Sequence, residues 1–159
     1  MLNMISAVGM AKLFQSGGKW RLWLRFCGWC CLLLSLLAST LVFLPPAMYN
    51  YPGGQALWDL HQMGDSGVVQ PGLVHIDAGA ATTGITRFWE RSPESGWSYS
   101  KVEGLTEWSA FDYLITEHPD HPGKEAHQVM KAVEGFDRID FMNFKIVTAP
   151  KIFVMKQNK

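Results

Sequence analysis

The chain has 159 residues and a formal net charge of zero, a balance that would suit one soluble domain. Its charges are unevenly placed, because four Lys or Arg and no acid precede residue 26, whereas residues 51–159 hold 14 acidic and 10 basic side chains. The later part therefore has no strongly basic stretch, which argues against nucleic acid as a partner.

The three cysteines, Cys27, Cys30 and Cys31, all lie in or beside an apolar segment. This placement excludes a secreted disulfide scaffold and a zinc ribbon in the later part of the chain. We expect the thiols to act as small hydrophobic side chains among apolar groups, with palmitoylation near the cytoplasmic face as the alternative.

The first predicted element is a mildly apolar cytoplasmic or interfacial helical segment, residues 1–25, followed by a transmembrane helix, residues 26–46. The stretch from Phe26 to Leu44 has no charged side chain. At about 1.5 Å rise per residue it is roughly 28 Å long, close to the ~30 Å hydrocarbon core of a bilayer. Pro45 and Pro46 are expected to end the helix because they lack backbone donors.

The positive flank before this segment predicts its orientation, with residues 1–25 cytoplasmic and residues 47–159 lumenal. Two alternatives to a membrane span fit the sequence less well. A cleaved signal peptide would have a shorter apolar core nearer the start of the chain. A buried core helix would show a polar face, and this segment is apolar all round apart from small hydroxyls.

Residues 47–159 are predicted to form a small α/β domain. Apolar residues at helical spacing predict a short helix from Gln55 to Met63. Strands are expected at residues 72–76, 97–102, 111–116 and 146–155, the last one broken or bulged at Pro150. A small-residue turn (77–83) and a helix (84–90) would complete a β–turn–α unit, while residues 129–136 fit either a strand or a helix. Strands that alternate with helices indicate a layered α/β fold.

Two glycine-containing motifs suggest chemistry, and each has a plainer explanation. Residues 79–84 lie between a strand and a predicted helix, where a phosphate-binding loop would lie, but Ile85 and Thr86 follow where a P-loop needs Lys and then Ser or Thr. Residues 64–67, Gly-Asp-Ser-Gly, resemble a serine-protease nucleophile loop without a visible base and carboxylate to complete a triad. A tight turn and a polar turn are therefore favoured.

The best candidate for a metal site is residues 117–122, with their acidic and histidine side chains, together with His127. Alternate prolines fix an extended path there and the spacing matches no accepted metal site, so a structural loop is favoured. His75 is expected to be a packed histidine within a strand. Asp77, at the strand end, suits ligand binding, although capping the next helix is the plainer role. No close carboxylate pair suggests glycoside hydrolysis.

The order Asn-Tyr-Pro-Gly-Gly at residues 50–54, directly after the membrane segment, is the most distinctive pattern in the chain. Together with residues 75–88, 97–101 and 111–117, it resembles the C-terminal region of the dolichyl-phosphate-mannose-dependent mannosyltransferases of glycosyltransferase family 22. The similarity is greatest to the branch in the endoplasmic reticulum that makes α-1,6 linkages on lipid-linked oligosaccharides. Family members often have a His two residues before the Asn, where this chain has Met48.

The resemblance implies that the chain is a C-terminal portion of a polytopic GT-C type enzyme of the endoplasmic reticulum membrane. Such enzymes transfer mannose from dolichyl-phosphate-mannose to a lipid-linked oligosaccharide for N-glycosylation, and they need no metal or other cofactor. The resemblance also implies a catalytic aspartate, acting as general base, in a lumenal loop that none of the carboxylates here matches. No catalytic residue is therefore assigned, and this chain alone is expected to be inactive.

The partners that the resemblance implies are membrane lipids and, through the full-length enzyme, the dolichol-linked donor and the oligosaccharide acceptor. Seven residues are candidates for the substrate-side rim: Asn50, Tyr51, Pro52, Gly53, Gly54, His75 and Asp77. An alternative from another class is a single-pass membrane protein whose lumenal domain binds a partner or regulates the enzyme. A third reading, a nucleotide-binding domain on a membrane anchor, rests only on the glycine turn.

Overall fold

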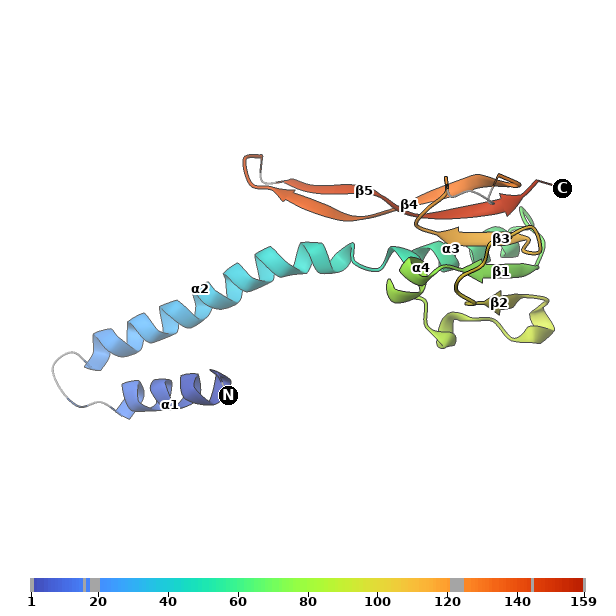
Figure 1. Cartoon of the computed structure of the whole chain (residues 1–159). Coiled ribbons are helices and arrows are strands. Elements are labelled where there is room, and N and C mark those ends of the chain that lie inside the picture. Colours follow the sequence, from blue (N-terminus) through green and yellow to red (C-terminus); the bar gives the residue numbers. More distant parts are fainter. Residues whose placement is uncertain (1, 16, 18–20, 121–124, 144, 159) are drawn as a thin grey trace. The chain divides into compact units, whose positions relative to one another are not determined.

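The computed structural model describes residues 2–15, 17, 21–120, 125–143 and 145–158 (Figure 1). The chain divides into two compact units, Met1–Pro45 and Pro46–Lys159. Helix α1 (Leu2–Gln15) and most of α2 (Arg21–Met48) belong to the first unit. The second unit contains a sheet and the remaining helices.

Within the described residues, α2 is the one helix that is long and apolar enough to cross a membrane, over Leu22–Met48. The predicted helix end at Pro45 and Pro46 is wrong, because the helix continues two residues further. Proline fixes φ at a helical value, so two prolines remove two donors without forcing the chain out of the helix. The amides of Tyr49 and Asn50 then donate to carbonyls of the last turn at 3.2 and 3.4 Å.

The second unit is built on a mixed five-stranded sheet in the order β2-β1-β3-β5-β4 (Figure 1). Its strands are β1 (Leu73–Ile76), β2 (Ser98–Ser100), β3 (Tyr113–Thr116), β4 (His127–Asp140) and β5 (Lys145–Gln157). Strand β1 runs parallel to both β2 and β3, and β5 runs antiparallel to β3 and β4. With the helices packed on this sheet, the predicted α/β class is confirmed.

The two long strands β4 and β5 form a hairpin at one edge of the sheet. Residues 129–136, which fitted either a strand or a helix, lie within β4. The predicted irregularity at Pro150 is confirmed, since Val133 pairs with Ile152 and Glu134 pairs with Pro150, leaving Lys151 as the extra residue. A bulge at this point suits a residue that has no backbone donor for the ladder.

The segment after β1 differs from the prediction. Residues expected to form a turn contain the short helix α4 (Ala78–Thr82), and the predicted helix at 84–90 is reduced to the 3₁₀ turn η1 (Arg87–Trp89). Gly84 has φ of 108°, a left-handed conformation that ends the helical path. A second 3₁₀ turn, η2 (Pro93–Ser95), precedes β2. Strand β1 is therefore followed directly by the helix α4, without the turn that was expected between a strand and a helix.

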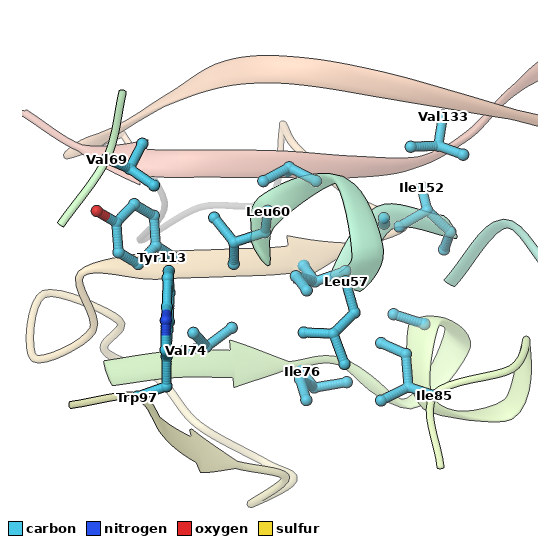
Figure 2. Close-up of a cluster of buried hydrophobic side chains, with 14 residues drawn as sticks. Leu57, Leu60, Val69, Val74, Ile76, Ile85, Trp97, Tyr113, Val133 and Ile152 are labelled. Atoms are coloured by element: carbon cyan, nitrogen blue, oxygen red, sulfur yellow. The ribbon is translucent and has the colours of Figure 1, made fainter. Parts of the chain in front are cut away.

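Helix α3 (Pro52–Asp65) covers one face of the sheet, as Figure 2 shows for Leu57 and Leu60. Side chains that point in opposite directions along β3 and β5 divide between two clusters, because successive residues of a strand face opposite sides. The α3 face gathers the larger set: Ala56, Leu57, Leu60, Val69, Val74, Ile76, Ala80, Ile85, Trp97, Tyr113, Ile115, Val133, Ile152 and Val154. Each fully buried leucine contributes roughly 1.5–3 kcal/mol to folding.

Candidate functional site

The segment of residues 50–54 forms the start of α3, and its backbone donors are bound by the turn after α4. The amide of Gly53 donates to Thr83 Oγ1 at 3.1 Å, and the amide of Gly54 donates to the Thr83 carbonyl at 3.1 Å. Pro52 has no N–H, and the amide of Gln55 donates to the Tyr51 carbonyl at 3.3 Å. These bonds satisfy the donors that a helix start leaves open, so this helix end offers no free amides to an anion.

The two glycines of this segment permit an unusually close approach to α4. A Cβ on Gly53 would lie 2.1 Å from the Ala80 carbonyl oxygen, and a Cβ on Gly54 would lie 3.0 Å from the Gly84 carbonyl oxygen. Side chains at these positions would collide with backbone, which explains why the sequence has glycine twice. Two patterns that stood out separately in the sequence, residues 50–54 and 77–84, therefore pack directly against each other.

Asp77 links three elements from the carboxyl end of β1. Its Oδ1 accepts from the Ala78 amide at 3.1 Å, which caps α4 as predicted. Its Oδ2 accepts from Thr116 Oγ1 at 2.6 Å, and its own amide donates to the Ile115 carbonyl at 2.9 Å. Both carboxylate oxygens thus have bonds within the fold, and Asp77 supports the α4 turn on which Gly53 and Gly54 rest.

His75 lies apart from the residues of the rim. It is 3% exposed, and its ring lies 4.9 Å from the Phe111 ring, tilted by 45°. Its strand neighbours Val74 and Ile76 point into the cluster under α3, so His75 faces the opposite side of the sheet. This is the packed histidine that the sequence predicted, and the structure does not bring it together with residues 50–54.

The segment weighed as a metal site, for which a structural loop was favoured, is only partly described, and His121 lies outside the described residues. Glu117 and His118 are exposed, whereas His127 is buried with its Nε2 2.8 Å from the Phe111 carbonyl oxygen. In the part of the chain that the structure describes, no three His, Cys, Asp or Glu side chains gather in an arrangement that could hold a metal.

The motif that resembles a protease loop ends α3. Ser66 Oγ donates to the Met63 carbonyl at 3.1 Å, and Asp65 forms a two-pronged pair with Arg91 at 2.6 and 2.7 Å. The hydrogen bond from Arg91 holds the pKa of the Asp65 carboxyl below its usual range. These contacts identify the motif as a polar turn at a helix end.

A buried polar pair that sequence reasoning missed lies beside this turn. His61 on α3 is 4% exposed, and its Nε2 lies 2.7 Å from Tyr99 Oη, which also accepts from the Arg91 amide at 3.2 Å. Burial, with the nearby Arg91 charge second, lowers the pKa of His61 to about 4. The histidine is therefore neutral at pH 7 and anchors α3 to the edge of β2.

An open groove with a volume of about 860 Å³ borders the start of α3. Its wall includes the half-exposed side chains of Trp58 and Trp89, whose rings meet edge to face at 5.8 Å. The lining comes from the end of α2 and the residues that follow it, from α3, from the residues around η1 and from β4: Met48, Tyr49, Tyr51, Pro52, Gly54, Gln55, Trp58, Asp59, Gly84, Thr86, Trp89, Lys131, Ala132, Val133 and Glu134. Of the seven predicted rim residues, the groove includes Tyr51, Pro52 and Gly54.

Comparison with curated proteins identifies relatives of one kind. The chain is 30% identical to an Arabidopsis thaliana protein over its whole length, and 31% identical to a Drosophila melanogaster protein over 90% of it. A Saccharomyces cerevisiae protein is 35% identical over 54% of the chain. All three are described as Dol-P-Man:Man(7)GlcNAc(2)-PP-Dol alpha-1,6-mannosyltransferases, which confirms the resemblance predicted from the sequence.

The chain spans only part of each relative, namely 33%, 21% and 17% of the plant, fly and yeast proteins. No protein-family model and no solved structure matches it.

Proposed function

Because the chain is related to one segment of the dolichyl-phosphate-mannose-dependent α-1,6-mannosyltransferases, we propose that it serves as the C-terminal portion of such an enzyme. The observation that supports this most strongly is that the whole chain aligns with an α-1,6-mannosyltransferase. In this proposal the complete protein transfers mannose from dolichyl-phosphate-mannose to a lipid-linked oligosaccharide used for N-glycosylation. The chemistry needs no metal, and its general base lies outside this segment.

The protein acts in the endoplasmic reticulum membrane, with α2 across the bilayer and the α/β domain in the lumen. The four basic residues before the apolar segment support this orientation, since short cytoplasmic flanks are rich in Lys and Arg. The lipid-linked donor and acceptor then meet the enzyme at the lumenal face. A single-pass regulatory protein, the alternative from another class, would have the same orientation but no transferase activity.

In this enzyme, residues 50–54 and the groove beside them form part of the lumenal rim, and the α/β domain covers the acceptor side. Tyr51 supports this role because it is 62% exposed and lines the groove, while Pro52 and Gly53 next to it are buried, with Gly53 close against α4. The buried residues fix the rim, and the exposed ring faces the groove.

The test is mannose transfer by the intact protein that contains this segment. Membranes are supplied with radiolabelled dolichyl-phosphate-mannose and Man7GlcNAc2 acceptor on dolichol, and the native protein is compared with Tyr51→Ala. We expect transfer to fall by about tenfold, equivalent to ~1.4 kcal/mol of lost interaction. Phe88→Ala, another exposed aromatic that does not line the groove, is the control and should keep its activity. Unchanged transfer by Tyr51→Ala at a normal protein level would contradict the role of the rim.

A further inference from the structure

Two tryptophan side chains remain half exposed on the wall of the groove. Trp58 on α3 is 45% exposed and Trp89 on η1 is 47% exposed, whereas Trp97 and Trp108 are 2% and 7% exposed. The rings of Trp58 and Trp89 stand at 90° to each other. Exposed indole surface is unfavourable in water, and tryptophan is enriched where proteins bind ligands and partners tightly. The pair forms an apolar platform that the domain itself leaves uncovered.

Hydrogen-bonding groups lie next to this platform. Asp59 Oδ2 pairs with Lys131 Nζ at 2.8 Å, and Gln55 Nε2 donates to Asp59 Oδ1 at 3.0 Å. Gln55, Trp58 and Asp59 are three and four residues apart, so their side chains share one face of α3. A ligand in the groove would therefore meet an indole ring and a carboxylate at the same helix face.

The charges of the groove favour a neutral occupant. Among its lining residues, Asp59 and Glu134 are acidic and Lys131 is basic, which leaves a net charge of −1. A phosphate would be repelled, and a hydrocarbon chain would bury Asp59 and Gln55 without new hydrogen bonds. A sugar ring suits both features, because its C–H face packs on the negative face of an indole and its hydroxyls bond to carboxylate and amide groups.

Building on the proposed function, we propose that this groove binds the mannose-rich glycan of the lipid-linked acceptor. Trp58 and Trp89 pack against the sugar C–H faces, and Asp59, held by Lys131, accepts hydrogen bonds from the sugar hydroxyls. The groove volume of about 860 Å³ lies within the range of small-molecule sites, roughly 300–1,000 Å³. The α/β domain thereby positions the acceptor by binding sugar units of the glycan that do not themselves react.

The experiment measures glycan binding without transfer. Free Man7GlcNAc2 oligosaccharide is titrated onto the intact protein in phosphatidylcholine nanodiscs, and saturation transfer from the protein to sugar protons is recorded by NMR. The native protein should saturate the mannose protons. Trp89→Ala and Trp58→Ala should raise the apparent Kd by about tenfold, and Asp59→Asn by several-fold. Phe88→Ala, beside Trp89 and 99% exposed but outside the groove, should bind like the native protein.

Two results would overturn the inference: no saturation by the native protein, or an unchanged Kd in Trp89→Ala. The second would leave the two rings as a surface for lipid or for another part of the enzyme. Trp89 is on an exposed turn, so Trp89→Ala is expected to fold, and it tests glycan binding even if Trp58→Ala fails to fold.

Transfer kinetics separate this inference from the proposed function. Trp89→Ala should raise the KM for the acceptor and leave kcat near its native value, because it removes uniform binding. If an active Trp89→Ala enzyme has the native KM for the acceptor, this result contradicts glycan binding in the groove but not the proposed transferase function. If the native protein binds the glycan but transfers no mannose, this result contradicts the proposed function but not glycan binding in the groove.

Discussion

Single residues decide how the start of α3 meets α4. Gly53 and Gly54 bring the two backbones together, and Thr83 satisfies both of their amides. Asp77 supports the same turn from β1 through its bonds to Ala78 and Thr116. The two glycines of residues 50–54 thus have a structural cause, which is independent of any contact with substrate.

Gly53→Ala should destabilise the domain. Its new Cβ would lie 2.1 Å from the Ala80 carbonyl oxygen, so α3 and α4 must move apart, at a cost of roughly 1–3 kcal/mol or more. Thermal unfolding in detergent, followed by tryptophan fluorescence, should show a lower Tm. Gly9→Ala is the control, because a Cβ there meets nothing within 4 Å and alanine favours a helix. Equal Tm values for the two variants would show that the close approach is unimportant.

Thr83→Val should also destabilise the domain, because it removes the acceptor of the Gly53 amide while keeping the side-chain shape. An unsatisfied buried donor costs about 1–3 kcal/mol. Thr83→Ser restores the hydroxyl and should recover most of the lost stability in the same unfolding experiment. If Val and Ser variants unfold alike, the hydroxyl bond has no net effect on stability.

Helices and strands could be predicted from the sequence where the spacing of apolar residues within a short segment determines them. Helix α3 and strands β1 and β3 follow from the spacing of apolar residues in short segments. The prediction of a helix at 84–90 was wrong because Gly84 adopts a left-handed φ, which the apolar pattern of its neighbours does not indicate. Strand β4 could not be assigned because its structure depends on pairing with β5. The groove was only partly foreseen, since Trp58, Trp89 and Lys131 come from three elements distant in sequence.

The burial of His61 makes the stability of the domain depend on pH. The pKa of His61 is lowered by burial from 6.5 to about 4 in the folded state, so the unfolded chain binds a proton more readily. Stability from this group is complete above pH 6.5 and is lost as the pH falls toward 4, by at most about 3 kcal/mol. Denaturant unfolding at pH 7 and pH 5 measures this loss.

Two variants isolate the contribution of His61 from that of other acidic groups. His61→Phe should flatten the dependence between pH 7 and pH 5, because the titrating group is gone. Gln62→Ala changes an exposed side chain next to His61 that does not titrate, and it should keep the native dependence. A native pH dependence in His61→Phe would contradict the assignment.

For the whole molecule, the proposed function requires that the α/β domain lies on the lumenal side of the membrane. Residues 1–159 contain no Asn-x-Ser/Thr acceptor site, so a site added within them is read as a difference from the native protein. Gly104 offers a suitable place, because it is exposed, lies two residues before Thr106 and has φ of 73°, a conformation that asparagine tolerates.

Gly104→Asn should be glycosylated in cells, because this loop lies in the lumen in the proposed orientation. The modification is measured as a mobility shift that an endoglycosidase removes. Ile5→Thr creates a site with Asn3 before the membrane segment and should stay unmodified. Modification of the Ile5→Thr protein and not of Gly104→Asn would reverse the proposed orientation.

The most direct test of the central claim is depletion of α-1,6-mannosyltransferase activity from source membranes. A detergent extract is passed over an antibody raised against residues 51–159, and transfer to Man7GlcNAc2 on dolichol is measured before and after. If residues 51–159 belong to the mannosyltransferase, activity disappears with the antigen and is recovered on the antibody. Full activity in an extract from which all antigen has been removed would contradict it.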